Sequence, residues 1–326
     1  MSLIGRLYRN DFHIEFIARR RIWYLITAVL LTVSVASMLI RGFSAGIEFS
    51  GGAVYQFPSN GGTVEQVEET LSEHGIDPDD GVIQQLETSG QFRVQTPTLS
   101  EEETRALEQA FIDRFDVADP ETEMAVSTVG SSWGSTITRK AVQGLLVFLL
   151  LVTVYLAFRF EWKMAVAAMA ALLHDLVVTM GVYSLVGFEV TPSTIIAVLT
   201  ILGFSLYDTV VVFDRVRENT AGMATSTRRT YAEAANDALN ETVVRSLNTS
   251  VIAVLPVGAL LFVGAGLLGA GTLKDLALAQ FVGVIAGTFS SLFLAAPLLV
   301  DLKRREPAVR ALDQRVARAR ANAARA

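Results

Sequence analysis

The sequence has no cysteine among its 326 residues and little charge, since Asp, Glu, Lys and Arg together make up 18%. Without thiols, neither a disulfide framework nor a thiolate metal site can form, so no metal site is expected. Hydrophobic residues make up 51% and the mean hydropathy is +0.42, which is too apolar for a domain that must cover itself with polar side chains. A membrane protein is therefore predicted.

Basic residues are scarce in one stretch of the chain. Residues 42–138 contain 18 acidic and 3 basic residues, a net charge of -15, whereas the whole chain carries -6, so the remainder is about +9. Because Lys and Arg set the cytoplasmic side of membrane proteins, this segregation indicates an acidic domain outside the cytoplasm. It does not indicate nucleic-acid binding.

Apolar windows of about 20 residues, enough for a helix to cross roughly 30 Å of hydrocarbon, occur six times. The predicted spans are Ile22–Ile40, Ile137–Phe158, Met164–Val186, Thr191–Phe213, Val243–Gly264 and Leu273–Val300. The predicted organisation is a cytoplasmic segment (1–21), a first span (22–40), an extracytoplasmic domain (41–136), a five-helix transmembrane region (137–300) and a basic cytoplasmic tail (301–326).

Basic clusters near the ends of the spans predict the orientation. These clusters are Arg19-Arg20-Arg21, Arg159 with Lys163, Arg215 to Arg229, and Lys303-Arg304-Arg305. They fall on one side if both termini are cytoplasmic, which predicts a multi-pass protein of the cell (inner, cytoplasmic) membrane.

The first window has an alternative interpretation as the core of a cleaved signal peptide. Ser34 and Ala36 could form the small-residue cleavage site. The window is longer than a usual signal core, and Asp11 and Glu15 precede it. These features favour an uncleaved anchor.

The stretch between the first two spans alternates between apolar and polar residues, which is typical of a water-soluble α+β domain. The expected elements are strand Ala53–Phe57, helix Val64–His74, strand Val82–Glu87, strand Phe92–Thr96, helix Glu101–Phe115 and strand Glu123–Val129. Capping-box spacings, Thr63 to Gln66 and Ser100 to Glu103, open both helices. The order βαββαβ resembles the ferredoxin-like fold, which hosts many functions and says little about activity.

Four ionisable residues interrupt the predicted spans: His174, Asp175, Asp208 and Arg245. Each charge costs at least about 2.5–3.5 kcal/mol on insertion scales, so each needs a reason. A proton relay is one interpretation, in which the carboxylates change protonation and Arg245 senses the change. The alternative is a set of interhelical contacts, with Arg245 extending to the interface.

Three further polar residues are expected to support this group. With Asp214 near the inner interface and a rise of about 1.5 Å per residue, Asp208 lies about 9 Å inside, level with Asn248 and Thr249. At that depth the long side chain of Arg245 could reach a carboxylate. An aspartyl protease is disfavoured, because Asp208 and Asp214 are about 9 Å and 120° apart on the helix and cannot share a proton.

Two segments outside the spans have simpler interpretations. Gly46, Glu48, Gly51 and Gly52 follow the first span and indicate a β-bulge or turn that joins membrane to domain, with no chemistry assigned. The basic tail after Asp301 is expected to lie against anionic lipid of the inner leaflet.

Several motifs resemble the SecF proteins of the SecD/SecF protein-export family, within the resistance-nodulation-division superfamily. The most specific runs from Leu199 to Asn219, LTILGFSLYDTVVVFDRVREN, in the fourth span. Supporting motifs are Phe160-Glu161-Trp162-Lys163, Leu173-His174-Asp175, Arg245-Ser246-Leu247-Asn248-Thr249-Ser250 and the glycine turn Gly46 to Gly52. The resemblance covers Arg20 to about Leu302.

The resemblance implies a complex with a SecD-like subunit beside the SecYEG channel, using the proton-motive force to complete polypeptide export. Asp208 and Arg245 fall on the family's proton-transport positions, and the external domain would engage exported polypeptides. Tyr207 stands where many relatives have Asn, and Glu48 where the turn often has Asp.

No enzymatic activity is expected, and no cofactor apart from protons as the coupling ion. From the residues alone, a generic proton-coupled transporter subunit ranks first and an assembly scaffold second. With the resemblance, the alternative to export is half of another proton-driven exporter of the same superfamily, for a small molecule or lipid.

Overall fold

The structure is a computed structural model that describes residues 13–86, 90–223, 228–265 and 271–325. Part of the predicted N-terminal segment, residues 1–12, lies outside this range. The elements, with π-helical turns η3 and η4, are α2 (Arg20–Arg41), β1 (Ser44–Ala45), α3 (Ile47–Ser50), β2 (Gly52–Pro58), α4 (Val64–Glu73), η1 (Pro78–Asp80), β3 (Val82–Leu86), β4 (Gln91–Thr96), α5 (Glu101–Phe115), α6 (Pro120–Glu123), β5 (Ala125–Val129), α7 (Ser131–Arg159), α8 (Trp162–Val186), β6 (Glu189–Val190), α9 (Pro192–Thr220), α10 (Tyr231–Ala259), η3 (Leu260–Ala265), α11 (Gly271–Ser290), η4 (Ser291–Ala295), α12 (Ala296–Lys303) and α13 (Pro307–Ala323).

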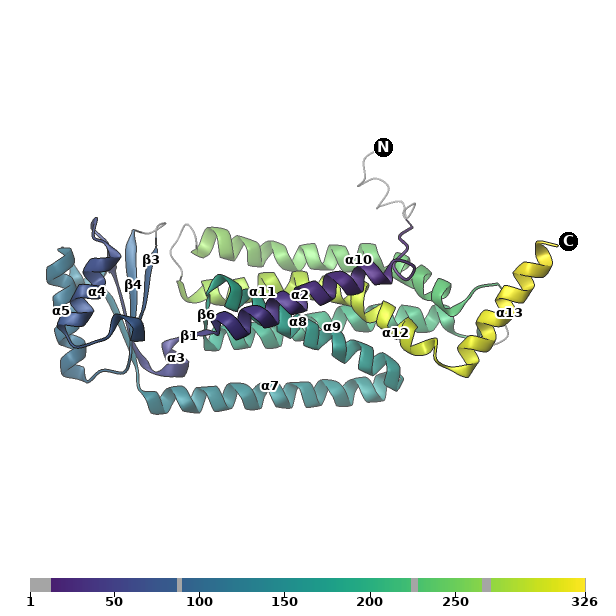
Figure 1. Cartoon of the computed structure of the whole chain (residues 1–326), viewed down its shortest axis with the longest axis horizontal. Coiled ribbons are helices and arrows are strands. Elements are labelled where there is room, and N and C mark those ends of the chain that lie inside the picture. Colours follow the sequence, from purple (N-terminus) through teal and green to yellow (C-terminus); the bar gives the residue numbers. More distant parts are fainter. Residues whose placement is uncertain (1–12, 87–89, 224–227, 266–270, 326) are drawn as a thin grey trace, which may run out of the picture.

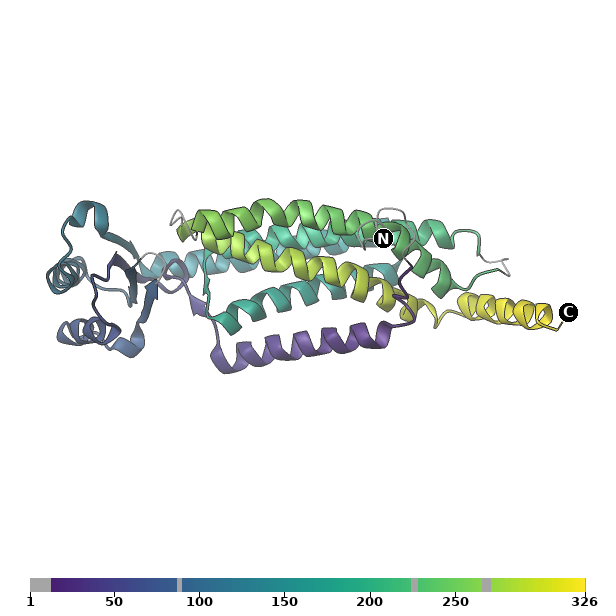
Figure 2. The same cartoon turned by 90° about the horizontal axis from the view of Figure 1, so that it is seen from above.

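Within the described residues, six helical segments are long and apolar enough to cross a membrane, and they lie side by side (Figures 1 and 2). The predicted number of spans is therefore confirmed. Three predicted spans are too short, because the second helix begins at Ser132 rather than Ile137, the fourth continues from Phe213 to Thr220, and the fifth begins at Tyr231 rather than Val243. The added turns are polar on one face, so a hydropathy window misses them.

The sixth predicted span is not one regular α-helix. It comprises α11, the π-helical turn η4 and α12. Its close packing against α9 depends on Gly283 and Gly287. A Cβ on Gly283 would overlap the side chain of Ile201, and one on Gly287 would lie 2.9 Å from Ser205 Cβ. These glycines let α11 approach α9 at the level of Ser205.

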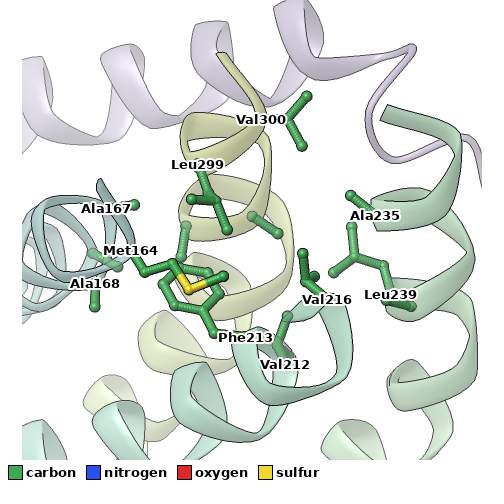
Figure 3. Packing of buried hydrophobic residues seen from close by; sticks show 14 of the residues in the cluster. Met164, Ala167, Ala168, Val212, Phe213, Val216, Ala235, Leu239, Leu299 and Val300 are labelled. Atoms are coloured by element: carbon green, nitrogen blue, oxygen red, sulfur yellow. The ribbon is translucent and has the colours of Figure 1, made fainter. Parts of the chain in front are cut away.

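Side chains from many helical segments form the apolar core of one end of the bundle, and Figure 3 shows part of it. Figure 3 shows Met164, Ala167 and Ala168 from α8, Val212, Phe213 and Val216 from α9, Ala235 and Leu239 from α10, and Leu299 and Val300 from α12. The first turns of α10, outside the predicted window, thus belong to the core. They fix the position of the helix that carries Arg245.

The N-terminal segment before α2 is held on the start of α10 by two asparagines. Asn240 Oδ1 accepts from the Ile14 amide at 2.7 Å, and Asn236 Oδ1 accepts from the Ile17 amide at 3.2 Å. Both side-chain amides also donate to the Ile14 carbonyl oxygen, at 3.0 and 2.9 Å. Asn236 and Asn240 are buried, so their side chains supply partners to the Ile14 and Ile17 main-chain groups that would otherwise lack them.

The domain between α2 and α7 is a four-stranded sheet, entirely antiparallel, in the order β3-β4-β2-β5. Helices α4 and α5 cover the face turned away from the bundle (Figure 1). Its core is aromatic, with the rings of Phe57 and Phe111 stacked at 4.7 Å. Both predicted capping boxes are present. The predicted strand Glu123–Val129 begins only at Ala125, because Pro120 starts the short helix α6.

The Gly46–Gly52 segment joins the first span to the sheet domain through one helical turn and not through a β-bulge. Its centre is the short helix α3, in which the Gly46 carbonyl accepts from Phe49 and Ser50 and Ile47 is buried. The paired glycines are nonetheless required after it. Gly51 has φ 76°, Gly52 has φ 132°, and a Cβ on Gly52 would overlap the Thr96 carbonyl oxygen.

The domain is attached to the bundle by a second connection besides the chain itself. Strand β1 pairs in parallel with β6, with Ser44 opposite Glu189. Arg93 of β4 forms an ion pair with Glu189, and Gln95 Nε2 donates to the Ala45 carbonyl oxygen at 3.2 Å. The four-stranded sheet is thereby linked to the residues that precede α9.

The basic tail forms a helix, α13, beyond the end of the bundle opposite the sheet domain (Figures 1 and 2). Its apolar side chains Val309, Leu312 and Val316 are buried in the bundle core. Arg320 pairs with Glu233 of α10 at 2.8 Å.

Candidate functional site

Asp208 lies on α9. Two residues set the start of this helix: the Thr191 hydroxyl accepts from the Thr194 amide, and Pro192 occupies the first turn. The residue is 4% exposed. Its Oδ1 accepts from Ser246 Oγ of α10 at 2.6 Å, and its Oδ2 accepts from Ser291 Oγ of η4 at 2.5 Å. The carboxyl group thus joins three membrane helices.

Asp175 on α8 is the second buried carboxyl group, with no exposed surface. Its Oδ2 accepts from Ser205 Oγ of α9 at 2.5 Å and from Ser290 Oγ of α11 at 2.8 Å. Its Oδ1 lies 3.0 Å from Nδ1 of His174. Because Ser205 precedes Asp208 by three residues, α9 contacts one carboxyl group and carries the other.

His174 is buried beside Asp175, and its second ring nitrogen is unpaired. Nε2 has no hydrogen-bond partner within the part of the chain that the structure describes. The ring lies 6.1 Å from the ring of Phe289, centroid to centroid. A buried imidazole with one nitrogen on a carboxyl group and the other unpaired can accept a proton at the unpaired nitrogen and pass the proton on its other nitrogen to the carboxylate, which leaves it in the other tautomer.

Arg245 does not reach Asp208, contrary to the prediction. Its Nη2 donates to the Tyr207 hydroxyl at 3.3 Å, and the side chain is exposed. The following residue, Ser246, is the one that bonds Asp208. Equal depth does not imply an equal face, because adjacent helical residues point about 100° apart.

The three supporting residues do not join the carboxyl groups either. Asn248 is exposed, and Thr249 Oγ1 donates to the Arg245 carbonyl oxygen at 2.9 Å. Asp214 accepts from Arg159 Nη2 with both carboxylate oxygens at 2.7 Å. This exposed ion pair between Arg159 and Asp214 holds the end of α7 against α9.

The residues that sequence reasoning missed are four serines: Ser205, Ser246, Ser290 and Ser291. All are buried, and each donates to one of the two carboxyl groups. A partial signal was present, since Ser205 lies one helical turn before Asp208 and Ser246 follows Arg245. Serine is common at helix interfaces, so the sequence does not single these four out.

The junction residues Gly46, Glu48, Gly51 and Gly52 lie far along the bundle axis from this site, at the sheet domain (Figure 1). Glu48 folds back over Gly46, where a Cβ would lie 2.5 Å from Glu48 Oε2. Among the described residues, no three His, Asp or Glu side chains are grouped so that they could hold a metal ion. The chemistry available to the buried site is proton binding by two carboxyl groups and an imidazole.

Six apolar helices that enclose hydroxyl-bound carboxyl groups define a polytopic membrane protein of the transporter type. The family model described as protein export membrane protein SecD/SecF, C-terminal, matches residues 112–305. The chain therefore belongs to the SecD/SecF family.

Its relatives and structural neighbours agree with this assignment. The protein translocase subunit SecF of Mycobacterium tuberculosis is 47% identical over 325 residues, covering 98% of this chain and 74% of that protein. SecF of Streptomyces coelicolor is 45% identical over 323 residues, covering 99% and 86%. The crystal structure of SecDF from Thermus thermophilus superposes with a TM-score of 0.80 at 36% identity, over 94% of this chain and 40% of that one.

Proposed function

We propose that this chain is a SecF-type accessory subunit of the Sec protein-export channel, which couples the proton-motive force to late polypeptide translocation together with a SecD-like subunit. The observation that carries the proposal is Asp208, a carboxyl group with 4% exposure between α9, α10 and η4, in a chain 47% identical to a translocase SecF subunit. An ionisable group at such a position is expensive and is retained for function.

Protons are the proposed coupling ion, with Asp208 and Asp175 as the groups that hold them. Each carboxyl group accepts two hydroxyl hydrogen bonds, which stabilise its ionised form. Protonation removes the charge and weakens these bonds, which changes how the helices contact one another. His174, through its unpaired Nε2, is the proposed exchange point beside Asp175.

Arg245 belongs to a polar surface on α9 and α10 that we assign to the SecD-like subunit. Tyr207 is 52% exposed, and Arg245 and Asn248 are exposed within the membrane-spanning part of the bundle. Facing lipid there would cost Arg245 several kcal/mol, on the order of 2.5–3.5 by insertion scales. A second membrane protein that covers this face removes that cost and brings Arg245 to the interface. The Thermus relative named SecDF supports such a pairing.

The location and the sheet domain follow from the same proposal. The chain would cross the cell membrane with both termini in the cytoplasm and with a ferredoxin-like domain outside, where it would engage exported polypeptides beside the SecYEG channel. Support comes from the strand order β3-β4-β2-β5 with two helices on one face, and from the acidic composition of residues 42–138. The Arg-rich exposed side of α13 would meet anionic lipid headgroups.

The experiment is proton-driven export in inverted membrane vesicles that contain the full chain and its SecD-like partner. Asp208→Asn keeps the size and one of the two hydrogen-bond acceptors but cannot ionise, and we expect at least tenfold loss of proton-dependent export with normal accumulation. Asp214→Asn, in the exposed pair with Arg159, is the matched control and keeps activity. Full proton-dependent export by the Asp208→Asn variant rejects the proposal.

A further inference from the structure

Ser290 and Ser291 are consecutive residues of the sixth span, and each donates to a different buried carboxyl group. Ser290 Oγ donates to Asp175 Oδ2 at 2.8 Å, and Ser291 Oγ donates to Asp208 Oδ2 at 2.5 Å. Asp175 lies on α8 and Asp208 on α9. Both serines have no exposed surface. Two adjacent side chains of one helix thus contact the ionisable groups of two others.

The helical geometry changes between these two serines. Helix α11 ends at Ser290, and the π-helical turn η4 begins at Ser291 and continues to Ala295. π-Helical turns are rare and occur frequently at functional sites. Here the turn starts at the residue that bonds Asp208. The site's hydrogen bonds and this irregular turn therefore occupy the same position.

Each serine hydroxyl also has a second acceptor within its own helix. Ser290 Oγ lies 3.2 Å from the Gly287 carbonyl oxygen, and Ser291 Oγ lies 3.1 Å from the Thr288 carbonyl oxygen. An ionised carboxylate is the stronger acceptor, whereas a protonated carboxyl group is weaker and is itself a donor. Protonation of a carboxyl group therefore shifts its serine toward the carbonyl group of its own helix.

We propose that Ser290 and Ser291 are positioning residues that couple the protonation of Asp175 and Asp208. Because the two hydroxyls are on adjacent residues at the α11–η4 joint, a shift of one serine moves the other, so a proton at one carboxyl group changes the hydrogen bonding of the other. The inference rests on the proposed proton coupling and adds a device in the sixth span that links two proton sites. Ser205 completes the link, since it bonds Asp175 from the helix that carries Asp208.

Of the ionisable groups named on the helices packed around the site, His174 shares it, and Arg245 and Tyr24 are bonded elsewhere. On α8, His174 lies beside Asp175, with its Nδ1 3.0 Å from Asp175 Oδ1. On α10, Arg245 bonds Tyr207 rather than a carboxyl group of the site. On α2, Tyr24 donates to Asp301 of α12 at 2.9 Å. The serine pair is therefore the contribution of the sixth span to the link between Asp175 and Asp208.

The test measures proton-driven export over a pH series, with the full chain and its SecD-like partner in inverted vesicles at constant membrane potential. Ser290→Ala and Ser291→Ala each remove a hydrogen bond to an ionised carboxylate. We expect each to move the pH midpoint upward by about half to one unit. Ser290→Thr and Ser291→Thr keep the hydroxyl and keep the wild-type midpoint. Coupling predicts that the shift in the double Ala variant differs from the sum of the single shifts.

The control is Ser37→Ala, which removes another buried hydroxyl bond between spans, from Ser37 Oγ to Ser184 Oγ at 3.1 Å, without touching a carboxyl group. It should leave the midpoint unchanged. If Ser291→Ala fails to accumulate, Ser291→Cys replaces it. Its side chain is nearly the same size as serine but a weak donor, so it should also move the pH midpoint upward. Unchanged midpoints in the Ser290 and Ser291 variants, or additive shifts, overturn the inference. An inactive Asp208→Asn in the same vesicles would show that the proton coupling itself still stands.

Discussion

Arg93 in the centre of the four-stranded sheet forms an ion pair with Glu189, which lies two residues before the N-cap of α9. The Glu189 side chain is 6% exposed and that of Arg93 is 26% exposed. Strand β6, which contains Glu189, also pairs with β1 at the end of the first span. The helix that carries Asp208 is thus connected at its start to the sheet domain, so a shift of α9 can be transmitted to that domain.

Removing one partner of this pair should be more damaging than removing both. Arg93→Met leaves the carboxylate of Glu189 buried without a counter-charge, and we expect a loss of about 3 kcal/mol of stability. Arg93→Met with Glu189→Gln should recover at least half of it. Thermal unfolding of the purified chain in detergent measures the difference. Arg105→Met, whose partner Glu101 is exposed, is the control and should change stability by less than about 1 kcal/mol. Additive losses in the double variant would contradict the coupling.

The two asparagines that hold the N-terminal segment should be individually important. Asn236→Ala leaves the buried Ile17 amide without its acceptor, and Asn240→Ala does the same to the part-buried Ile14 amide, which costs about 1–3 kcal/mol. We expect a lower unfolding temperature and faster proteolysis before α2. Asp237→Ala lies between them and breaks only a surface pair with Arg229, so it should have little effect. Equal effects of all three variants would reject the proposed anchoring.

The sequence predicts the spans well because apolar runs of membrane length are rare outside membrane-crossing helices. It also predicts the buried carboxyl groups, since Asp175 and Asp208 are conspicuous in apolar surroundings. It does not predict which neighbour bonds them. Arg245 and Ser246 have almost the same depth but different faces, and only the packing of α10 on α9 decides between them.

The sequence also fails to predict the short irregular elements of the fold, because they too depend on contacts distant in the chain. Strands β1 and β6 have two residues each, and α3 has four, too few for any periodicity to appear. The π-helical turn η4 has no sequence pattern of its own and depends on tertiary contacts. By contrast, the two longer helices of the sheet domain, α4 and α5, were predictable because a capping box opens each of them.

The polar face of α9 and α10 gives a prediction about the partner. A photoreactive amino acid at Asn248, which is exposed beside Arg245, should cross-link to the SecD-like subunit in membranes of cells that express both chains. The same group at Leu150 on α7, which is 62% exposed and surrounded by apolar residues, should contact lipid and give no such product. Immunoblotting for both chains detects the product. Cross-linking at Leu150 but not at Asn248 would place the partner on another face.

The joint between α12 and α13 should be sensitive to acid. Partial burial raises the pKa of Glu306, but Lys163 at 2.9 Å and Lys303 at 3.4 Å together hold this pKa below its ordinary value of 4.5. A carboxyl group whose pKa is lower in the folded state stabilises the protein above its unfolded pKa, and this contribution is lost as the pH falls through the folded pKa. At neutral pH the contribution is therefore complete, and below about pH 4.5 it declines.

Glu306→Gln tests this directly. Because the Glu306 side chain is 29% exposed, solvent screens its ion pairs, and we expect a loss of at most about 1 kcal/mol at pH 7, seen as a lower unfolding temperature in detergent. The difference from the unaltered protein should narrow as the pH falls below about 4.5, because the carboxyl group of the unfolded state then binds protons more readily than that of the folded state. Glu121→Gln, on the exposed surface of α6, should show no difference at either pH. A difference of the same size at pH 7 and pH 4 would mean that Glu306 stabilises the joint through packing and not through its charge.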